Sequence, residues 1–142
     1  MFKKILVPLD GSKLAEKILP QVEELVKLSG AEVHLLKVVM SYEVDPKKDK
    51  EELEKLSSEA QKYLDQVAAR LKKSAIQALA VVAPGKDAVK ICDYASGKKC
   101  NLIAMSTHGR SGLSRWALGS VADKVLQCSN VPVMLFRATE SE

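Results

Sequence analysis

The residues best suited to chemistry are small, polar and rich in glycine, and they cluster in one segment. That segment reads Ser106-Thr107-His108-Gly109-Arg110-Ser111-Gly112, and the pair Gly119-Ser120 follows it. Backbone N–H groups of such a loop can point inward with little steric obstruction. A helix beginning at Ser120 would add unpaired N–H groups and about half a unit of positive dipole charge. This combination favours an anion site, and phosphate is its natural ligand.

Two other polar segments follow apolar runs and offer further candidate groups. Asp10-Gly11-Ser12 supplies a carboxylate, although it can equally form a turn that caps the next helix. Pro84-Gly85-Lys86-Asp87 has the composition of a turn. His108 alone is typical of a hydrogen-bonding loop residue, and Trp116 of a side chain that packs over a sheet. A functional site therefore requires that the first of these segments meets the glycine-rich loop in space.

Signatures of several enzyme classes are missing from the sequence. It contains no G-x-x-x-x-G-K-[ST] motif and no G-x-G-x-x-G after the first apolar run, which disfavours P-loop NTPases and dinucleotide folds. No cluster of carboxylates or histidines has the composition of a metal cage, and no serine or cysteine lies beside an evident base. The sequence therefore supports a binding module better than a catalyst.

Charge and composition argue against nucleic acid and membrane as partners. The 142 residues carry a net charge of +4, which comes from lysine pairs in separate segments without interleaved aromatic residues. No run approaches the ~20 apolar residues of a membrane span. Asp10 ends the first run before it reaches the length of a secretion signal. Cys92, Cys100 and Cys128 match no metal spacing, so we expect reduced thiols and a cytoplasmic location.

Five short apolar runs alternate with longer amphipathic segments. The runs predict strands at residues 5–9, 33–39, 76–82, 102–105 and 131–136. Helices are expected at residues 12–29, 49–73, 86–97 and 120–128. His34 and Lys37 interrupt the second run and are expected at its less covered positions, and residues 41–48 form the one stretch expected to be disordered. The alternation predicts a single α/β domain over residues 1–142, built on a doubly wound parallel sheet.

Local signals place the ends of two helices. Ser12 is expected to cap the first helix and Gly30 to end it, while Pro20 should kink it or restrict its first turns. Ser120 with Asp123 has the spacing of a capping box at the start of the last helix.

Two stretches give the sequence a resemblance to a known family. Residues 4–12, K-I-L-V-P-L-D-G-S, resemble the opening of universal stress proteins. Residues 101–109, followed by nine residues and Gly119-Ser120, resemble the nucleotide signature of that family, G-x-x-G-x9-G-[ST]. The turn at Gly85 also resembles a family pattern, with Asp87 where proline is common. The resemblance covers essentially the whole chain.

This resemblance implies a three-layer fold, a five-stranded sheet of order 3-2-1-4-5 with four helices, and ATP bound at its carboxyl edge, with Mg²⁺ possible near Asp10. Val38 would touch the adenine, and Met105 would line the base and sugar. The residues implied to bind the nucleotide are Pro8, Asp10, Val38, Met105, Ser106, Gly109, Arg110, Gly119, Ser120 and Val121. Ser106 replaces the first glycine of the signature, and its side chain can either crowd the nucleotide or donate a hydrogen bond to it.

Three functions remain open at this point. The leading one is a stress-response regulatory module that binds ATP and at most hydrolyses it slowly or autophosphorylates. The second is a nucleotide-free dimeric interaction domain. The third is an ATP-using enzyme of the related α-hydrolase fold, although residues 9–13 do not match the S-G-G-x-D-S loop of such enzymes. We also expect a homodimer through the run from Val131 to Phe136, because this apolar strand would lie at a sheet edge.

Overall fold

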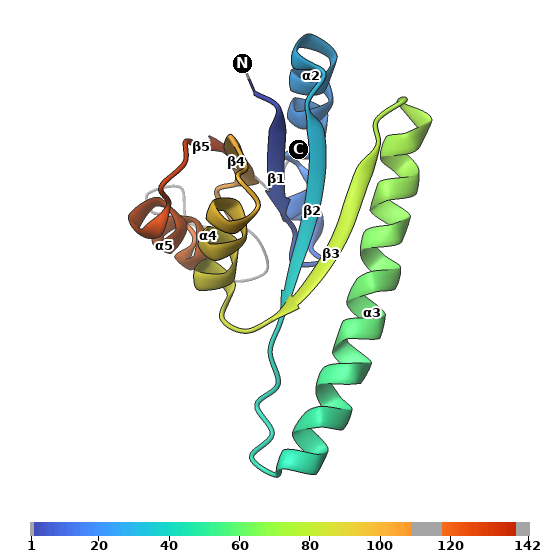
Figure 1. Cartoon of the computed structure of the whole chain (residues 1–142), viewed down its shortest axis with the longest axis vertical. Helices are drawn as coiled ribbons and strands as arrows, with labels where there is room; N and C mark the ends of the chain where they lie inside the picture. Colours follow the sequence, from blue (N-terminus) through green and yellow to red (C-terminus); the bar gives the residue numbers. More distant parts are fainter. Residues whose placement is uncertain (1, 109–117, 139–142) are drawn as a thin grey trace.

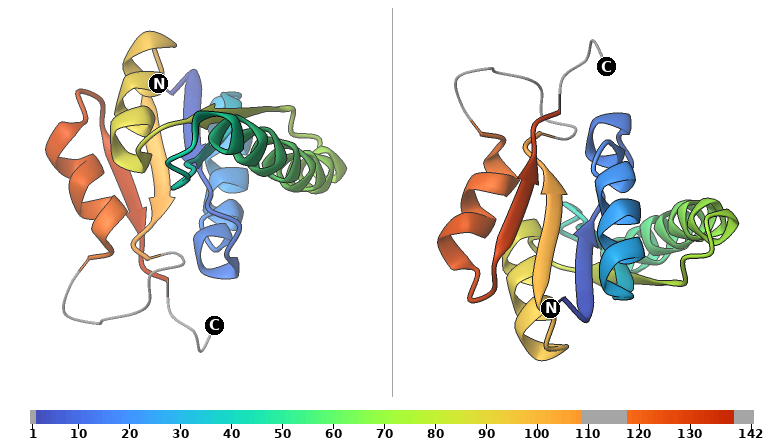
Figure 2. Two further views of the ribbon diagram at one scale, coloured as in Figure 1. Left: turned by 90° about the horizontal axis from the view of Figure 1, so that it is seen from below. Right: turned by 90° about the horizontal axis from the view of Figure 1, so that it is seen from above.

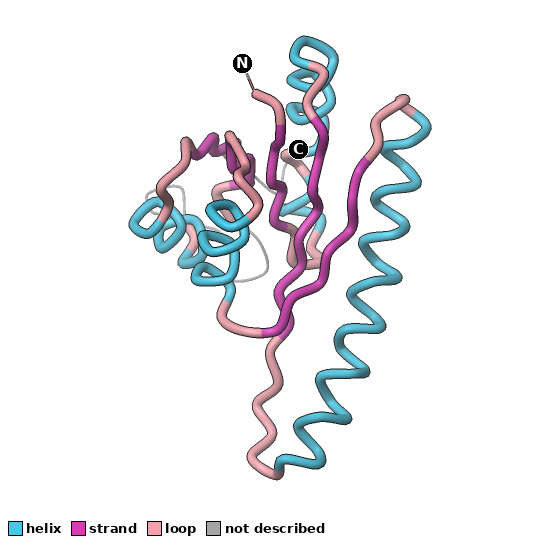
Figure 3. Tube along the Cα trace, viewed as in Figure 1, coloured by secondary structure: helices cyan, strands magenta, loops and turns pink. Residues whose placement is uncertain are grey.

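The computed structural model describes residues 2–108 and 118–138, and its centre is a five-stranded parallel sheet (Figures 1 and 3). The strands are β1 (Lys4–Pro8), β2 (Glu32–Val39), β3 (Ala78–Pro84), β4 (Leu102–Ser106) and β5 (Val133–Phe136). Their order is β3-β2-β1-β4-β5, which confirms the predicted fold class and strand order. The order reverses between β1 and β4, so their carboxyl ends lie together at the switch point.

Helices cover both faces of the sheet and complete three layers. They are α1 (Lys13–Glu16), α2 (Leu19–Ser29), α3 (Pro46–Lys73), α4 (Asp87–Gly97) and α5 (Ser120–Cys128). Figure 2 shows α4 and α5 on one side of the sheet and α1 and α2 on the other, and α3 runs along β3 in Figure 1. The sheet has a hydrophobic core on each face, and alternate strand residues point into one or the other. Ile5 and Val7 pack with α1, α2 and α3, whereas Leu6 packs with α4 and α5.

The first predicted helix is split at Pro20 into α1 and α2. Ser12 caps α1 as predicted, since its Oγ accepts a hydrogen bond from the Ala15 N–H at 3.1 Å. Proline lacks an N–H and clashes with the carbonyl four residues earlier, here that of Glu16, where α1 ends. Gly30 ends α2 with a left-handed φ of 70°, also as predicted. The two segments together form one of the four helical connections.

Several other boundaries differ from the sequence-based expectation, and local contacts explain three of them. The stretch predicted to be disordered, residues 41–48, already contains the start of α3, because Asp45 caps it by accepting from the Lys47 N–H at 2.9 Å. Strand β3 begins two residues late, because the Ile76 N–H still bonds to the α3 carbonyl of Leu71. The predicted capping box at Ser120 is wrong: Gly119 is the N-cap, and Ser120 is the first helical residue.

Two of the three cysteines are joined, so the prediction of three reduced thiols is wrong. Cys92 of α4 and Cys128 of α5 form a disulfide, although they are 36 positions apart in sequence. Because α4 and α5 pack side by side on one face of the sheet, the Cα atoms of the two residues lie 6.2 Å apart, within the usual range for a disulfide. Cys100 is free and buried, and this burial raises the pKa of its thiol.

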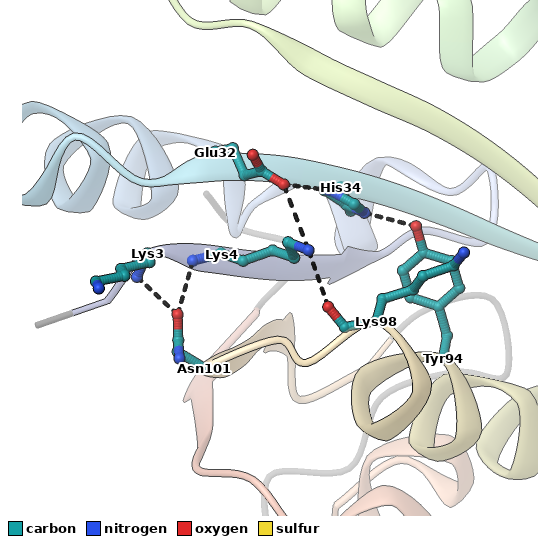
Figure 4. A network of polar contacts seen from close by, with 7 residues as sticks. All are labelled: Lys3, Lys4, Glu32, His34, Tyr94, Lys98 and Asn101. Atoms are coloured by element: carbon teal, nitrogen blue, oxygen red, sulfur yellow. Dashed lines mark hydrogen bonds and ion pairs between the residues drawn. The ribbon is translucent and has the colours of Figure 1, made fainter.

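A network of polar side chains links β1, β2 and α4 at the amino edge of the sheet, the end opposite the switch point (Figure 4). His34 Nε2 lies 2.9 Å from a Glu32 carboxylate oxygen and its Nδ1 lies 2.5 Å from the Tyr94 hydroxyl of α4. The Asn101 side-chain oxygen accepts hydrogen bonds from the backbone N–H groups of Lys3 and Lys4. The expectation of a less covered His34 is therefore wrong: it is only 6% exposed, and its ring links β2 to α4.

Within the described ranges, no helix combines the length and the apolar composition that a membrane crossing requires.

Candidate functional site

A cavity of about 260 Å³ opens at the carboxyl ends of β1, β2 and β4, where the strand order reverses. Its volume lies near the lower bound of about 300 Å³ for small-molecule sites. Eight of the ten residues predicted to bind a ligand line it, from four different segments: Pro8, Asp10, Val38, Met105, Ser106, Gly119, Ser120 and Val121. The other two, Gly109 and Arg110, lie outside the described residues. Chain segments far apart in sequence thus meet at one place, as the functional interpretation required.

Asp10 serves both the cavity wall and the turn after β1. Its Oδ1 accepts hydrogen bonds from the Ser12 backbone N–H at 2.9 Å and from the Ser12 hydroxyl at 2.6 Å. Gly11 between them has a φ of 89°, a left-handed conformation that suits glycine. Asp10 thereby positions the residue that caps α1, and it also places a carboxylate beside the cavity. The two interpretations of Asp10, turn former and ligand contact, are compatible.

Ser106 uses its hydroxyl inside the protein. The side chain is 5% exposed, and Oγ donates a hydrogen bond to the Ala15 carbonyl of α1 at 3.0 Å. The residue in the place of the signature glycine therefore ties the end of β4 to α1, while it still lines the cavity. The hydroxyl of Thr107 is also engaged with protein groups. Its Oγ1 accepts a hydrogen bond from the Ala138 N–H at 3.2 Å and lies 3.0 Å from His108 Nδ1.

Gly119 brings the start of α5 against the loop that follows β4. Its N–H donates to the Thr107 carbonyl at 2.9 Å. A Cβ on Gly119 would lie only 2.8 Å from that carbonyl oxygen and 3.3 Å from the Cα of His108, both of which are backbone atoms. Glycine is therefore required at this position by the fold itself. Its small size also lets the first turn of α5, from Ser120 to Ala122, form one wall of the cavity.

The cavity has an apolar side and a polar side. Val38, Ile91 and Met105 supply apolar wall from β2, α4 and β4, a surface that suits a flat ring. The first turn of α5 supplies the positive end of a helix dipole, which suits an anion. An apolar surface next to an anion site is the arrangement that a nucleotide needs.

Sequence reasoning missed two charged residues of the wall, Lys37 and Asp87. In the sequence, Lys37 stands out only as an interruption of an apolar run, and Asp87 only as part of a turn and as a departure from a family proline. The signal that could have found them is their position at the carboxyl edge of the sheet: Lys37 lies near the end of β2, which pairs with β1, and Asp87 follows the end of β3. Within residues 2–108 and 118–138, no group of three histidine, cysteine or acidic side chains could hold a metal ion on its own.

Comparison with known sequences finds one protein family that matches nearly the whole chain. The sequence model of the universal stress protein family matches residues 1–137. Universal stress protein MJ0531 of Methanocaldococcus jannaschii is 31% identical over 146 aligned residues, which cover 100% of this chain and 86% of the relative.

Comparison with solved structures shows the same fold. Protein MJ0577 of M. jannaschii superposes with a TM-score of 0.87 at 30% identity, covering 99% of each chain. Two more distant structures, both 17% identical, were solved with a nucleotide. One is a universal stress protein in complex with cAMP, with a TM-score of 0.74 and coverage of 97% and 98%. The other is an Arabidopsis thaliana family member with AMP bound, with a TM-score of 0.72 and coverage of 98% and 94%.

Replacing Gly119 should destabilise the fold because the new methyl group would press on backbone atoms. We expect Gly119→Ala to lower the free energy of unfolding by about 1–3 kcal/mol, measured by urea denaturation. The control is Gly97→Ala at the end of α4, where a Cβ would meet nothing within 4 Å, and this variant should be as stable as the parent or slightly more so. Equal stability of the two variants would contradict the close approach.

Removing the Ser106 hydroxyl should weaken the link between β4 and α1. We expect Ser106→Ala to cost about 0.5–1.5 kcal/mol of unfolding free energy, the net value of one hydrogen bond. Ser106→Gly should cost more, since glycine also loses backbone entropy on folding. Denaturant unfolding of both variants measures this ranking, and a Ser106→Ala variant as stable as the parent would show that the hydroxyl does not hold α1.

Proposed function

The chain belongs to the universal stress protein family, and from that membership and the cavity we propose that it binds an adenine nucleotide, ATP by first choice. The observation that carries the proposal is the meeting of eight predicted site residues around one cavity at the switch point. The output of binding is a change in partner or oligomer state, which makes the protein a stress-response regulatory module. The nucleotide complexes of two relatives, with cAMP and with AMP, support an adenine ligand.

The polarity of the cavity orients the nucleotide. The adenine lies against Val38 and Met105, because a base gains most from contact with apolar side chains. The phosphates lie at Gly119, Ser120 and Val121, where N–H groups and the dipole of α5 favour negative charge. Gly109 and Arg110 complete the predicted phosphate site.

A divalent cation would resolve a conflict of charge in this arrangement. Asp10 and Asp87 both line the cavity, and their carboxylates repel a triphosphate, which Lys37 offsets only in part. Mg²⁺ is commonly held by one or two carboxylates together with phosphate oxygens and water. Asp10 fits that role because it stands at the end of β1, next to β4 and the loop that leads to α5. We therefore propose MgATP as the ligand.

The direct test is nucleotide binding by the purified protein. Mass spectrometry of the denatured protein should find copurified adenine nucleotide, and calorimetry of nucleotide-free protein should show saturable binding of MgATP with weaker binding of MgGTP. Absence of both copurified nucleotide and MgATP binding would contradict the proposal and would favour the nucleotide-free interaction domain.

Two substitutions at Asp10 separate its charge from its turn. Asp10→Asn keeps a side-chain oxygen that can accept from Ser12, whereas Asp10→Ala loses both the charge and the acceptor. We expect Asp10→Asn to reduce the dependence of ATP affinity on Mg²⁺ at least fivefold, with unfolding free energy close to that of the parent. Asp10→Ala should lose the same Mg²⁺ dependence and also stability, by about 1 kcal/mol.

Calorimetry with and without Mg²⁺, together with urea denaturation, provides both readouts. If Asp10→Asn binds MgATP with the Mg²⁺ dependence of the parent, Asp10 is a turn former alone.

We propose that the protein forms a homodimer through the open edge of β5. The carbonyls of Pro132 and Phe136 accept hydrogen bonds from the N–H groups of Ile103 in β4 and of Thr107 just after it. The alternate residues Val133 and Leu135 therefore direct their N–H and C=O groups to the other edge of β5. Pairing with the same strand of a second copy across a two-fold axis would satisfy both edges. A cytoplasmic location also remains a prediction, and the disulfide removes the argument from reduced cysteines.

The edge pairing can be tested by removing one outward N–H. We expect the parent to be a dimer at tens of micromolar by light scattering, and Leu135→Pro to be a folded monomer, because proline has no N–H to offer the partner. Leu135→Ala is the matched control, since it shortens the same side chain and keeps the N–H, and it should remain a dimer. Lysine at Val133 or Leu135 is less informative because both side chains pack on the α4–α5 core. A monomeric parent would contradict the proposal.

A further inference from the structure

The disulfide between Cys92 and Cys128 joins the two helices that flank one side of the cavity. Cys92 follows Ile91, a cavity-wall residue of α4, and Cys128 ends α5, whose first turn forms another part of the wall. The segment closed by the bond contains the end of β4, Thr107, His108 and the whole of α5. A covalent change at this pair therefore acts on the two elements that must keep a fixed spacing around a ligand.

The surroundings of the two sulfur atoms suit exchange between oxidised and reduced forms. Cys92 is 8% exposed, whereas Cys128 lies on the exposed side of α5, where a small thiol can approach it. Cys92 Sγ lies 3.8 Å from the Val125 carbonyl oxygen, and Cys128 Sγ lies 3.6 Å from that of Ala88. After reduction each thiol thus has a carbonyl of the opposite helix within reach of a weak S–H hydrogen bond. Both forms fit the same helix packing.

We propose that Cys92 and Cys128 form a reversible thiol–disulfide exchange site whose oxidised form binds the nucleotide more tightly. The inference rests on the proposed nucleotide binding. Reduction begins when the thiolate of a small-molecule thiol, such as glutathione, attacks Cys128 Sγ. The bond between the cysteines breaks, and Cys92 leaves as a thiolate that takes up a proton. A second thiol attacks the mixed disulfide, which releases Cys128 and the oxidised small molecule. Oxidation by a small-molecule disulfide reverses both steps.

The coupling to binding follows from the freedom of α5. Its start is held to the β4 loop by the Gly119 N–H, and its end is held to α4 by the disulfide. Reduction removes the second restraint. A ligand that contacts both Ile91 and Val121 must then order α5 against α4, and the entropy lost in that ordering weakens the free energy of binding. Coupling of this kind is reciprocal: the nucleotide must favour the oxidised pair by the factor by which oxidation favours the nucleotide.

The first experiment compares MgATP affinity in the two redox states by calorimetry. We expect reduction with a dithiol to weaken binding about fivefold, at the low end of typical coupling. The variant Cys92→Ser/Cys128→Ser should bind like the reduced parent and should not respond to the dithiol. Cys100→Ala is the matched control, because it removes the buried free thiol and should keep the full response. Circular dichroism of each sample establishes that the fold is retained.

The second experiment measures the reciprocal effect. In a glutathione redox buffer, saturating MgATP should raise the equilibrium ratio of disulfide to dithiol by the same factor, counted by alkylation and mass spectrometry. Equal MgATP affinity of the oxidised and reduced proteins, or a redox ratio indifferent to MgATP, would overturn the inference and leave the proposed function intact. No MgATP binding by the oxidised protein would overturn the proposed function and this inference with it.

Discussion

Backbone pairing between β1 and β4 is the constraint on which the site of this protein depends. Ile5 pairs with Leu102 and Leu6 with Ile103, although the two strands are nearly a hundred residues apart in sequence. Because the two strands are parallel, their carboxyl ends and the loops that follow them lie at the same edge of the sheet. The turn at Asp10, the loop from Ser106 and the start of α5 are neighbours only as a consequence of that pairing.

Much of this arrangement could be predicted because it follows from periodic patterns. Apolar runs such as residues 33–39 indicate strands covered on both faces, and alternation with helices indicates a parallel sheet. The strand order itself came from the family resemblance carried by residues 4–12 and Gly119-Ser120. These signals sufficed to name eight residues that line the cavity.

What could not be predicted depends on contacts between elements. The pairing of Cys92 with Cys128 follows from how α4 packs beside α5, and no spacing in the sequence encodes that packing. The burial of His34 depends on Tyr94 and Glu32, which offer partners to both of its ring nitrogens. The same holds for Gly119, where a family motif indicates a phosphate contact but only coordinates reveal the nearby Thr107 carbonyl.

Polar side chains at both ends of the sheet are bound to other protein groups. At the amino edge, His34, Asn101 and their partners satisfy one another and fix β1, β2 and α4 in place. At the carboxyl edge, the hydroxyls of Ser106 and Thr107 are likewise engaged with protein groups. Under the proposed function, a nucleotide there would be recognised by the backbone of the first α5 turn and by the charges of Asp10, Lys37 and Asp87, which line the cavity.

Under the proposed function, the free energy of nucleotide binding would depend more on the position of α5 than on any single hydroxyl. Backbone N–H groups contribute to binding only when the helix holds them at the correct distance from the anion. The position of α5 is set at one end by the contact of Gly119 with Thr107 and at the other by the bond of Cys128 to Cys92. Under the proposed function, a change at either end would alter binding: at Gly119 through the steric fit of the helix start, and at Cys128, outside direct ligand contact, through redox state.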